Sequence, residues 1–166
     1  LHETVSEDRS HQKFQTHCAR IAFILNSYGN LVSRSVPTIN LMLHDLRQSI
    51  AVHAQYCMHN SNESGAVVDA KLIISSGLHP STCVSLIHSL YMLDAYDEEL
   101  CDHASSVLDY AVSFHQNLSS HLTIHSASNL LVALCYFGIG SSELFSYLLG
   151  YLSRSEMLIE EHQRKI

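Results

Sequence analysis

The sequence predicts an all-α protein in which antiparallel helical hairpins stack as a short α-solenoid of about seven helices. Apolar residues recur at helical spacing, and no segment shows sustained alternation of apolar and polar residues. Helix breakers are scarce, with two prolines and six glycines in 166 residues. A pattern is also repeated, as SLYMLDAYDEEL at 89–100 and ALCYFGIGSSEL at 133–144, which predicts two equivalent helical turns.

The first half of the chain is expected to hold three helices. Apolar residues at helical spacing, followed by NSYGN, predict a helix over 10–25. Pro37 suits the first turn of a second helix over 37–57, because the N–H that proline lacks has no partner there. The segment HNSNESG ends that helix, and a third is expected over 66–75.

Four further helices are expected in the second half, and residues at their starts identify them. Pro80 opens the first, and the Asp97 side chain is expected to cap the second. Ser119 or Ser120 is expected to cap the third, and Ser141 the fourth. The expected ranges are 80–92, 97–111, 119–137 and 141–152.

The two copies of the repeat align with apolar residues on apolar residues. Asp94 of the first copy corresponds to Gly138 of the second, and both residue types tolerate a left-handed backbone. Repeated helix pairs bury their apolar faces only against neighbouring pairs, which predicts one helical-repeat domain over 1–166. The matched residues are Leu86 and Leu130, Leu90 and Leu134, Glu99 and Glu143, Leu100 and Leu144, and Leu108 and Leu152. The hairpin units are expected at about 80–114 and 120–153, with degenerate units before 78.

Charge is distributed unevenly along the chain. The net charge is −7, and the span between Lys71 and Arg154 holds seven acidic residues and no Lys or Arg. Nucleic-acid binding needs cations that neutralise phosphates, so we expect no RNA contact through residues 72–153. Basic residues lie toward the two ends, where they form either solvated helix faces or an RNA contact. The candidates for that contact are Arg9, Lys13, Arg20, Arg34, Arg47, Arg154, Arg164 and Lys165.

Tyrosines fall on or beside both repeat units. Tyrosine is enriched at protein interfaces, although packing with the hydroxyl at the rim of a core explains the same positions. The candidate interface residues are Tyr91, Tyr96, Tyr110 and Tyr147.

No motif in the sequence identifies a reaction. His121 and His125 have the spacing of two ligands on one helix, but no third ligand accompanies them. Cys135 lies in the most apolar predicted helix, where a packed thiol is expected. Glu98 and Glu99 are explained by their place in the first turn of a helix. We therefore expect no enzyme activity, no cofactor and no metal site.

The cysteines, the apolar runs and the first residue of the sequence bear on the cellular compartment of the protein. Five scattered cysteines are typical of buried free thiols and favour a reducing compartment. The longest apolar run is about half of the ~20 residues that cross a bilayer, so no transmembrane segment is expected. The chain begins at Leu1 rather than Met, which leaves open either a removed targeting peptide or a longer chain.

The repeat resembles the degenerate helical hairpins of FAST-kinase-like and RAP-domain proteins, also called octotricopeptide or heptatricopeptide repeats. The resemblance covers 86–110 and 130–152, in which an apolar helix, a Gly or Asp turn and Glu-Leu precede a second apolar helix. It implies a role on organelle RNA or in a mitochondrial ribosome. No RAP-like C-terminal domain is visible within 1–166, and the cationic positions expected of such repeats are absent from 85–152, which favours binding to protein.

These observations lead to one main hypothesis and one alternative. The first is a non-catalytic scaffold or adaptor in a mitochondrial ribonucleoprotein assembly, above all a mitochondrial ribosome. Its partners would be other protein subunits, with RNA contacts limited to the basic ends. The alternative is an accessory structural subunit of a respiratory-chain or ATP synthase complex, which fits the acidic middle of the chain.

Overall fold

The protein is all-helical in the part that the structure describes. The computed structural model describes the backbone of residues 2–31, 35–63, 77–113 and 118–163, and the side chains of 9–31, 35–59, 77–113 and 118–155. These residues form six α-helices and one 3-10 helix, and none of them lies in a strand. The elements are α1 (His2–Gly29), α2 (Val36–Glu63), α4 (Pro80–Leu93), α5 (Glu98–Ser113), η1 (Leu118–His121), α6 (Ile124–Phe137) and α7 (Ser142–Gln163).

Most of the predicted helix starts are confirmed. Pro37 lies in the first turn of α2 and Pro80 is the first residue of α4. Asp97 caps α5, since its Oδ1 accepts a hydrogen bond of 3.2 Å from the N–H of Leu100. Ser141 caps α7 in the same way, with Oγ 3.1 Å from the nitrogen of Leu144.

The predicted cap of α6 is wrong. Ser119 and Ser120 lie in the 3-10 helix η1, and Thr123 caps α6 instead. Thr123 and Ser126 form a reciprocal capping box, in which each side chain accepts from the backbone N–H of the other.

The ends of α1 also differ from the prediction. The helix continues to Gly29, through the NSYG segment that was expected to end it. The Ser27 hydroxyl donates a hydrogen bond of 3.0 Å to the carbonyl of Phe23, one turn earlier in the same helix. Gly29 permits a close approach to α4, because a Cβ there would lie 2.9 Å from Cβ of Met92. The third expected helix, over 66–75, lies outside the described residues.

The turns after α4 and α6 have the same geometry. Asp94 has φ 52° and ψ 40°, and Gly138 has φ 67° and ψ 33°, so both end their helices in the left-handed conformation predicted for them. The next residue donates back in each case, from Ala95 to the carbonyl of Leu90 at 3.0 Å and from Ile139 to that of Leu134 at 3.1 Å. Each bond has its counterpart 44 positions along the chain.

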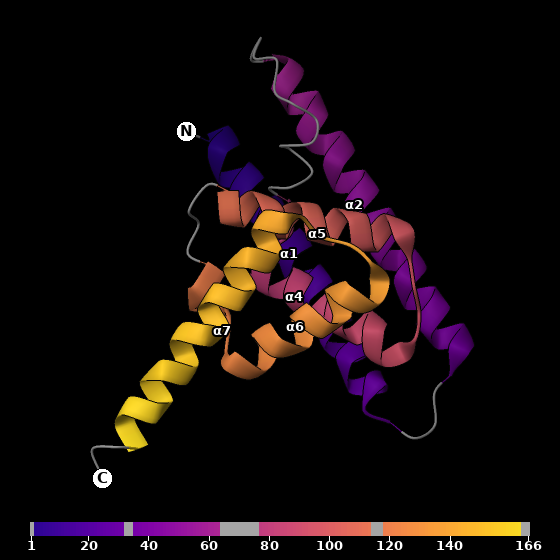
Figure 1. Ribbon diagram of the computed structural model, residues 1–166. Coiled ribbons are helices and arrows are strands. Elements are labelled where there is room, and N and C mark those ends of the chain that lie inside the picture. Colours follow the sequence, from indigo (N-terminus) through magenta and orange to yellow (C-terminus); the bar gives the residue numbers. More distant parts are fainter. Residues whose placement is uncertain (1, 32–34, 64–76, 114–117, 164–166) are drawn as a thin grey trace.

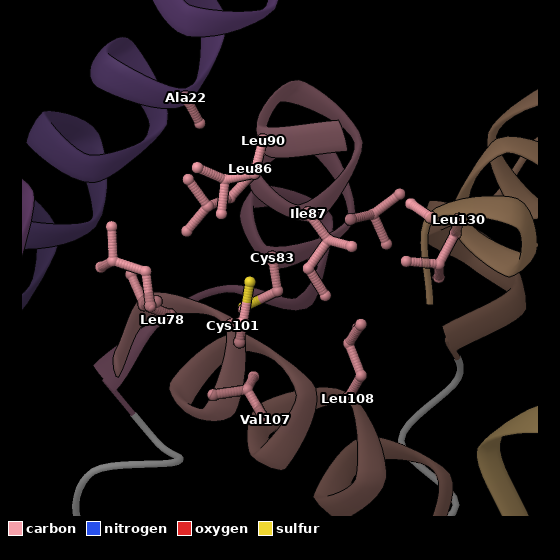
Figure 2. Close-up of a cluster of buried hydrophobic side chains, with 14 of the residues drawn as sticks. Ala22, Leu78, Cys83, Leu86, Ile87, Leu90, Cys101, Val107, Leu108 and Leu130 are labelled. Atoms are coloured by element: carbon pink, nitrogen blue, oxygen red, sulfur yellow. The ribbon is translucent and has the colours of Figure 1, made fainter. Parts of the chain in front are cut away.

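The hydrophobic core surrounds α4, which contacts α1, α5 and α6. Figure 2 shows side chains of all four helices converging there, with Ile87 of α4 directed toward Leu130 of α6. The leucines matched by the repeat are buried here, with one partly buried exception, Leu152. The buried members are Leu86, Leu90, Leu100, Leu108, Leu130, Leu134 and Leu144.

Outside this core, neighbouring helices contact one another in pairs. α1 contacts α2, α6 contacts α7, and α5 contacts α7. In Figure 1, α2 runs along one edge of the molecule and α7 extends toward the C-terminus. None of the described helices is both long enough and apolar enough to span a bilayer.

Candidate interaction surfaces

An aromatic cluster joins the two equivalent turns. Tyr136 of α6 lies edge-on to Tyr91 of α4, with ring centroids 5.2 Å apart, and its hydroxyl donates to Oδ1 of Asp94 at 2.7 Å. Phe137 lies between Tyr136 and Tyr96, at centroid distances of 5.3 and 5.4 Å. The cluster therefore connects the end of α4, the turn that follows it and the end of α6.

Part of this aromatic cluster faces solvent. Tyr96 is 55% exposed and Tyr136 is 59% exposed. The hydrogen bond to Asp94 raises the pKa of Tyr136, so the phenol stays protonated as a donor. Tyr96 also has a raised pKa, first through local desolvation and then through Cys101 and nearby carboxylates. The exposed surface of the aromatic cluster is therefore bordered by acidic residues.

The structure brings together two of the four predicted interface tyrosines. Tyr91 and Tyr96 belong to the cluster, whereas Tyr147 packs partly buried against the core. Tyr110 is half-buried near the opposite end of α5 from Tyr96. Sequence reasoning did not select Tyr136 for the interface, because its contacts to Tyr91 and Asp94 depend on how α4 and α6 pack.

Three of the predicted basic residues lie on one face of α1. Arg9, Lys13 and Arg20 are exposed and follow one another at spacings of four and seven residues. Together with Gln12, Thr16 and His17 they line a shallow hollow of about 340 Å³. This basic face can bind phosphate groups or acidic side chains.

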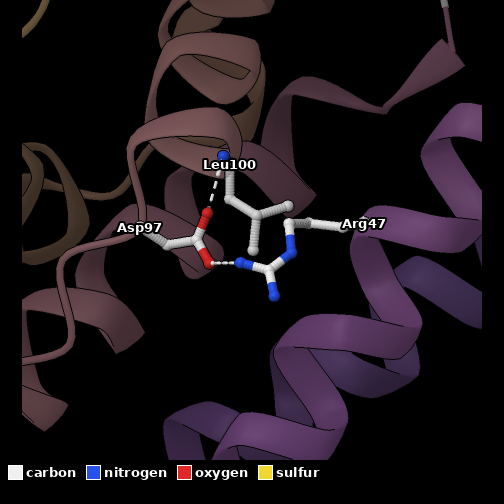
Figure 3. A network of polar contacts seen from close by, with 3 residues as sticks. All are labelled: Arg47, Asp97 and Leu100. Carbon is white, nitrogen blue, oxygen red and sulfur yellow. Dashed lines mark hydrogen bonds and ion pairs between the residues drawn. The ribbon is translucent and has the colours of Figure 1, made fainter.

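Arg47 has a structural contact within the chain (Figure 3). Its Nη1 donates to Oδ2 of Asp97 at 2.6 Å, while Oδ1 of the same carboxylate caps α5 through Leu100. The Asp97 side chain is 7% exposed and that of Arg47 is 36% exposed. This contact links α2 to the start of α5. Arg154 is exposed on α7, and Arg34, Arg164 and Lys165 lie outside the described residues.

A cavity of about 490 Å³ opens between α1 and α2. His53 lines it, with its ring stacked on Phe14 at 4.0 Å and Nε2 at 3.2 Å from Nδ1 of His11. Burial and the neighbouring His11 lower the pKa of His53, so the ring is neutral at physiological pH. Sequence reasoning missed His53, because the two rings that it contacts, His11 and Phe14, lie about 40 positions away in the chain.

The residues considered for chemistry are dispersed. His121 belongs to η1 and His125 to α6, so the pair does not share a helix as predicted. His121 instead meets the ring of His79 edge-on at 4.7 Å. No group of three or more His, Cys, Asp or Glu residues with metal-binding geometry occurs among the described residues. Glu98 and Glu99 lie exposed in the first turn of α5, as expected of residues that complement a helix dipole.

The five cysteines differ in burial, and Cys57 is intermediate. Cys18, Cys83 and Cys101 are buried, and burial raises the pKa of Cys101 to about 11, which keeps the thiol protonated. Cys135 is exposed, contrary to the prediction of a packed thiol. The apolar composition of α6 predicted burial on every side, but one face of this helix has no covering helix among the described residues.

Comparison of the chain with family models, curated proteins and solved structures gives no match. Function is therefore inferred from the fold and from these surfaces.

Proposed function

We propose that the chain is a non-catalytic helical-repeat scaffold, a subunit that holds other macromolecules in a larger assembly. The observation that supports it is the equivalence of the two turns, in dihedral angles, in backbone hydrogen bonds and in the caps that follow them. Stacked helical repeats generally act as extended binding surfaces.

The scaffold is a short α-solenoid, in which the described α-helices form three pairs. α4 with α5 forms one unit and α6 with α7 the next, which agrees with the contacts between α4 and α6 and between α5 and α7. α1 with α2 forms an earlier, degenerate unit, since α1 contacts α2 and α4. The buried matched leucines form the seam between successive units.

The assembly proposed is a mitochondrial ribonucleoprotein particle, in first place a mitochondrial ribosome. The repeat resemblance motivates the location, and the basic face of α1 provides the RNA contact through Arg9, Lys13 and Arg20. The region from α4 to α7 is acidic and aromatic, and it binds protein. The alternative, a structural subunit of a respiratory-chain or ATP synthase complex, is favoured by the absence of Lys and Arg from 72–153.

Sedimentation of native lysate tests the proposal. We expect the chain to sediment with a ribosomal particle and to leave it after RNase treatment. A chain that stays with inner-membrane complexes regardless of RNase supports the alternative, and a chain found only as a free monomer overturns both.

Charge reversal on α1 tests the RNA contact itself. The triple variant Arg9→Glu, Lys13→Glu and Arg20→Glu should weaken association with the particle, and its difference from the wild type should shrink as the salt concentration rises. Leu41→Glu is the control, because it adds a negative charge at an exposed position of α2 that is not a candidate for the RNA contact. Equal behaviour of the two variants would remove the basic face of α1 from the RNA contact.

A further inference from the structure

The outward face of α6 is uncharged, mostly apolar and exposed. The helix, IHSASNLLVALCYF, contains no Asp, Glu, Lys or Arg in its 14 residues. Ile124 is 40% exposed and Val132 is 47% exposed, and Cys135 and the small Ser128 are exposed as well. Spacings of four, four and three residues place these four side chains in one stripe, which we call the α6 face.

The corresponding face of α4 is more buried, and α6 contacts part of it. Ser128 corresponds to Val84 in the repeat, and Val84 is only 5% exposed. Cys135 corresponds to Tyr91, whose ring contacts Tyr136 of α6. The α6 face is thus the counterpart of a face that is more buried one unit earlier.

Two further pairs of equivalent positions also differ in exposure between the two units. Val132 corresponds to His88, which is half-buried and whose pKa is lowered by burial and then by His125 of α6. On the other helix of the unit, Leu149 of α7 is 54% exposed, whereas its counterpart on α5, Ser105, is 7% exposed. Positions that are covered in the first unit are therefore open in the second, and the two larger side chains there are apolar.

The opposite end of the stack is different. The outward residues of α1 include three cations, Arg9, Lys13 and Arg20, beside the exposed Phe23 and Ile24. The α6 face has no charged residue and only the small Ser128 as a polar one, so its composition is closer to that of an internal interface.

We propose that the α6 face binds an amphipathic helix of another protein, in the position that a following repeat unit would occupy. This inference rests on the proposed scaffold function and specifies the kind of partner. The α4–α6 interface within the chain sets the mode of contact, in which an aliphatic helix of about 14 residues lies against its neighbour. The small side chain of Ser128, between Ile124 and Val132, leaves room for a partner helix to approach closely.

The charges near the α6 face indicate which charge a partner helix should carry. Asp94 is bound to Tyr136 at the C-terminal end of α6, and Glu143 follows on α7, while no Lys or Arg occurs from 72 to 153. A partner helix with Lys or Arg at the end that meets these carboxylates is therefore complementary. A second copy of this chain that docked through residues 72–153 would offer no Lys or Arg to these carboxylates.

Sedimentation of Val132→Lys tests the α6 face. Val132 is exposed, so the variant should keep the helical content and melting temperature of the wild type while being lost from the particle. Leu41→Lys is the matched control, since Leu41 is 67% exposed in the interior of α2, and this variant should stay with the particle. Wild-type protein that sediments free overturns the scaffold function, whereas a Val132→Lys variant that remains bound overturns the α6 face alone.

A photo-crosslinking amino acid at position 132 identifies the occupant in cells. We expect cross-links to one protein, within a segment that has apolar residues at helical spacing and a Lys or Arg at one end. Cross-links to RNA, to another copy of this chain or to many unrelated proteins would each overturn the inference. The same amino acid at position 41 measures nonspecific capture.

Discussion

Replacing Asp97 separates two contributions to stability, because its carboxylate makes two contacts. Oδ1 accepts from the backbone N–H of Leu100, and Oδ2 lies 2.6 Å from Nη1 of Arg47. Asp97→Asn keeps an oxygen that can cap α5 and removes the negative charge. Asp97→Ala removes both contacts.

We expect Asp97→Ala to lower the free energy of unfolding by about 2–3 kcal/mol. The lost N-cap accounts for about 1 kcal/mol. The lost ion pair accounts for about 1–2 kcal/mol, less than for a fully buried pair, because the Arg47 side chain is 36% exposed and water screens its charge. Asp97→Asn and Arg47→Met should each cost about 1–2 kcal/mol, since each leaves the charge of the other residue without its partner.

Urea unfolding, monitored by the circular dichroism of the helices, measures these changes in free energy. The slope of the free energy against urea concentration should be the same for all variants. The double variant Asp97→Asn with Arg47→Met should be less unstable than the sum of the single variants by about 1 kcal/mol. Glu99→Gln is the control, because this exposed carboxylate in the same turn should contribute no more than about 0.5 kcal/mol. Strict additivity would refute the ion pair, and equal destabilisation by Asn and Ala would refute the cap.

Three further predictions concern the repeat and pH. Leu90→Ala and Leu134→Ala should each cost about 2–5 kcal/mol and agree within about 1 kcal/mol, because both are fully buried at equivalent positions. Gly138→Ala should cost about 1 kcal/mol, because φ is 67° there; a melting curve unchanged from wild type would contradict the left-handed turn. His103 has a pKa lowered by burial from 6.5 to about 4, so the unfolded chain takes up its proton first and stability falls as pH drops through that range. His103→Gln should flatten this decline, which urea titrations at several pH values would measure.

Local signals made the ends of helices predictable from the sequence. Pro80, Asp97, Ser141 and Gly138 act on their own backbone or on residues within one turn, so a single sequence suffices to place them. Thr123 was overlooked because Ser119 and Ser120 give an equally good local signal, which the chain uses in a 3-10 turn.

Long-range contacts could not be predicted in this way. The contact of Arg47 with Asp97 joins residues 50 positions apart, and that of Tyr136 with Asp94 joins residues 42 positions apart. The exposure of Cys135 has the same origin, since apolar composition predicts burial without stating which helix provides the cover. The sequence analysis named Arg9, Lys13 and Arg20 as basic residues near one end of the chain, but it did not place them together on one helix face.

Thiol labelling of Cys135 is the most direct test that this chain is a scaffold with a covered α6 face. In the isolated chain Cys135 is exposed while Cys18, Cys83 and Cys101 are buried, so an alkylating reagent should modify position 135 far faster than those three. In the native particle we predict that Cys135 is protected, with site-resolved mass spectrometry as the readout. Equal labelling of Cys135 in the isolated chain and in the native particle would contradict the account.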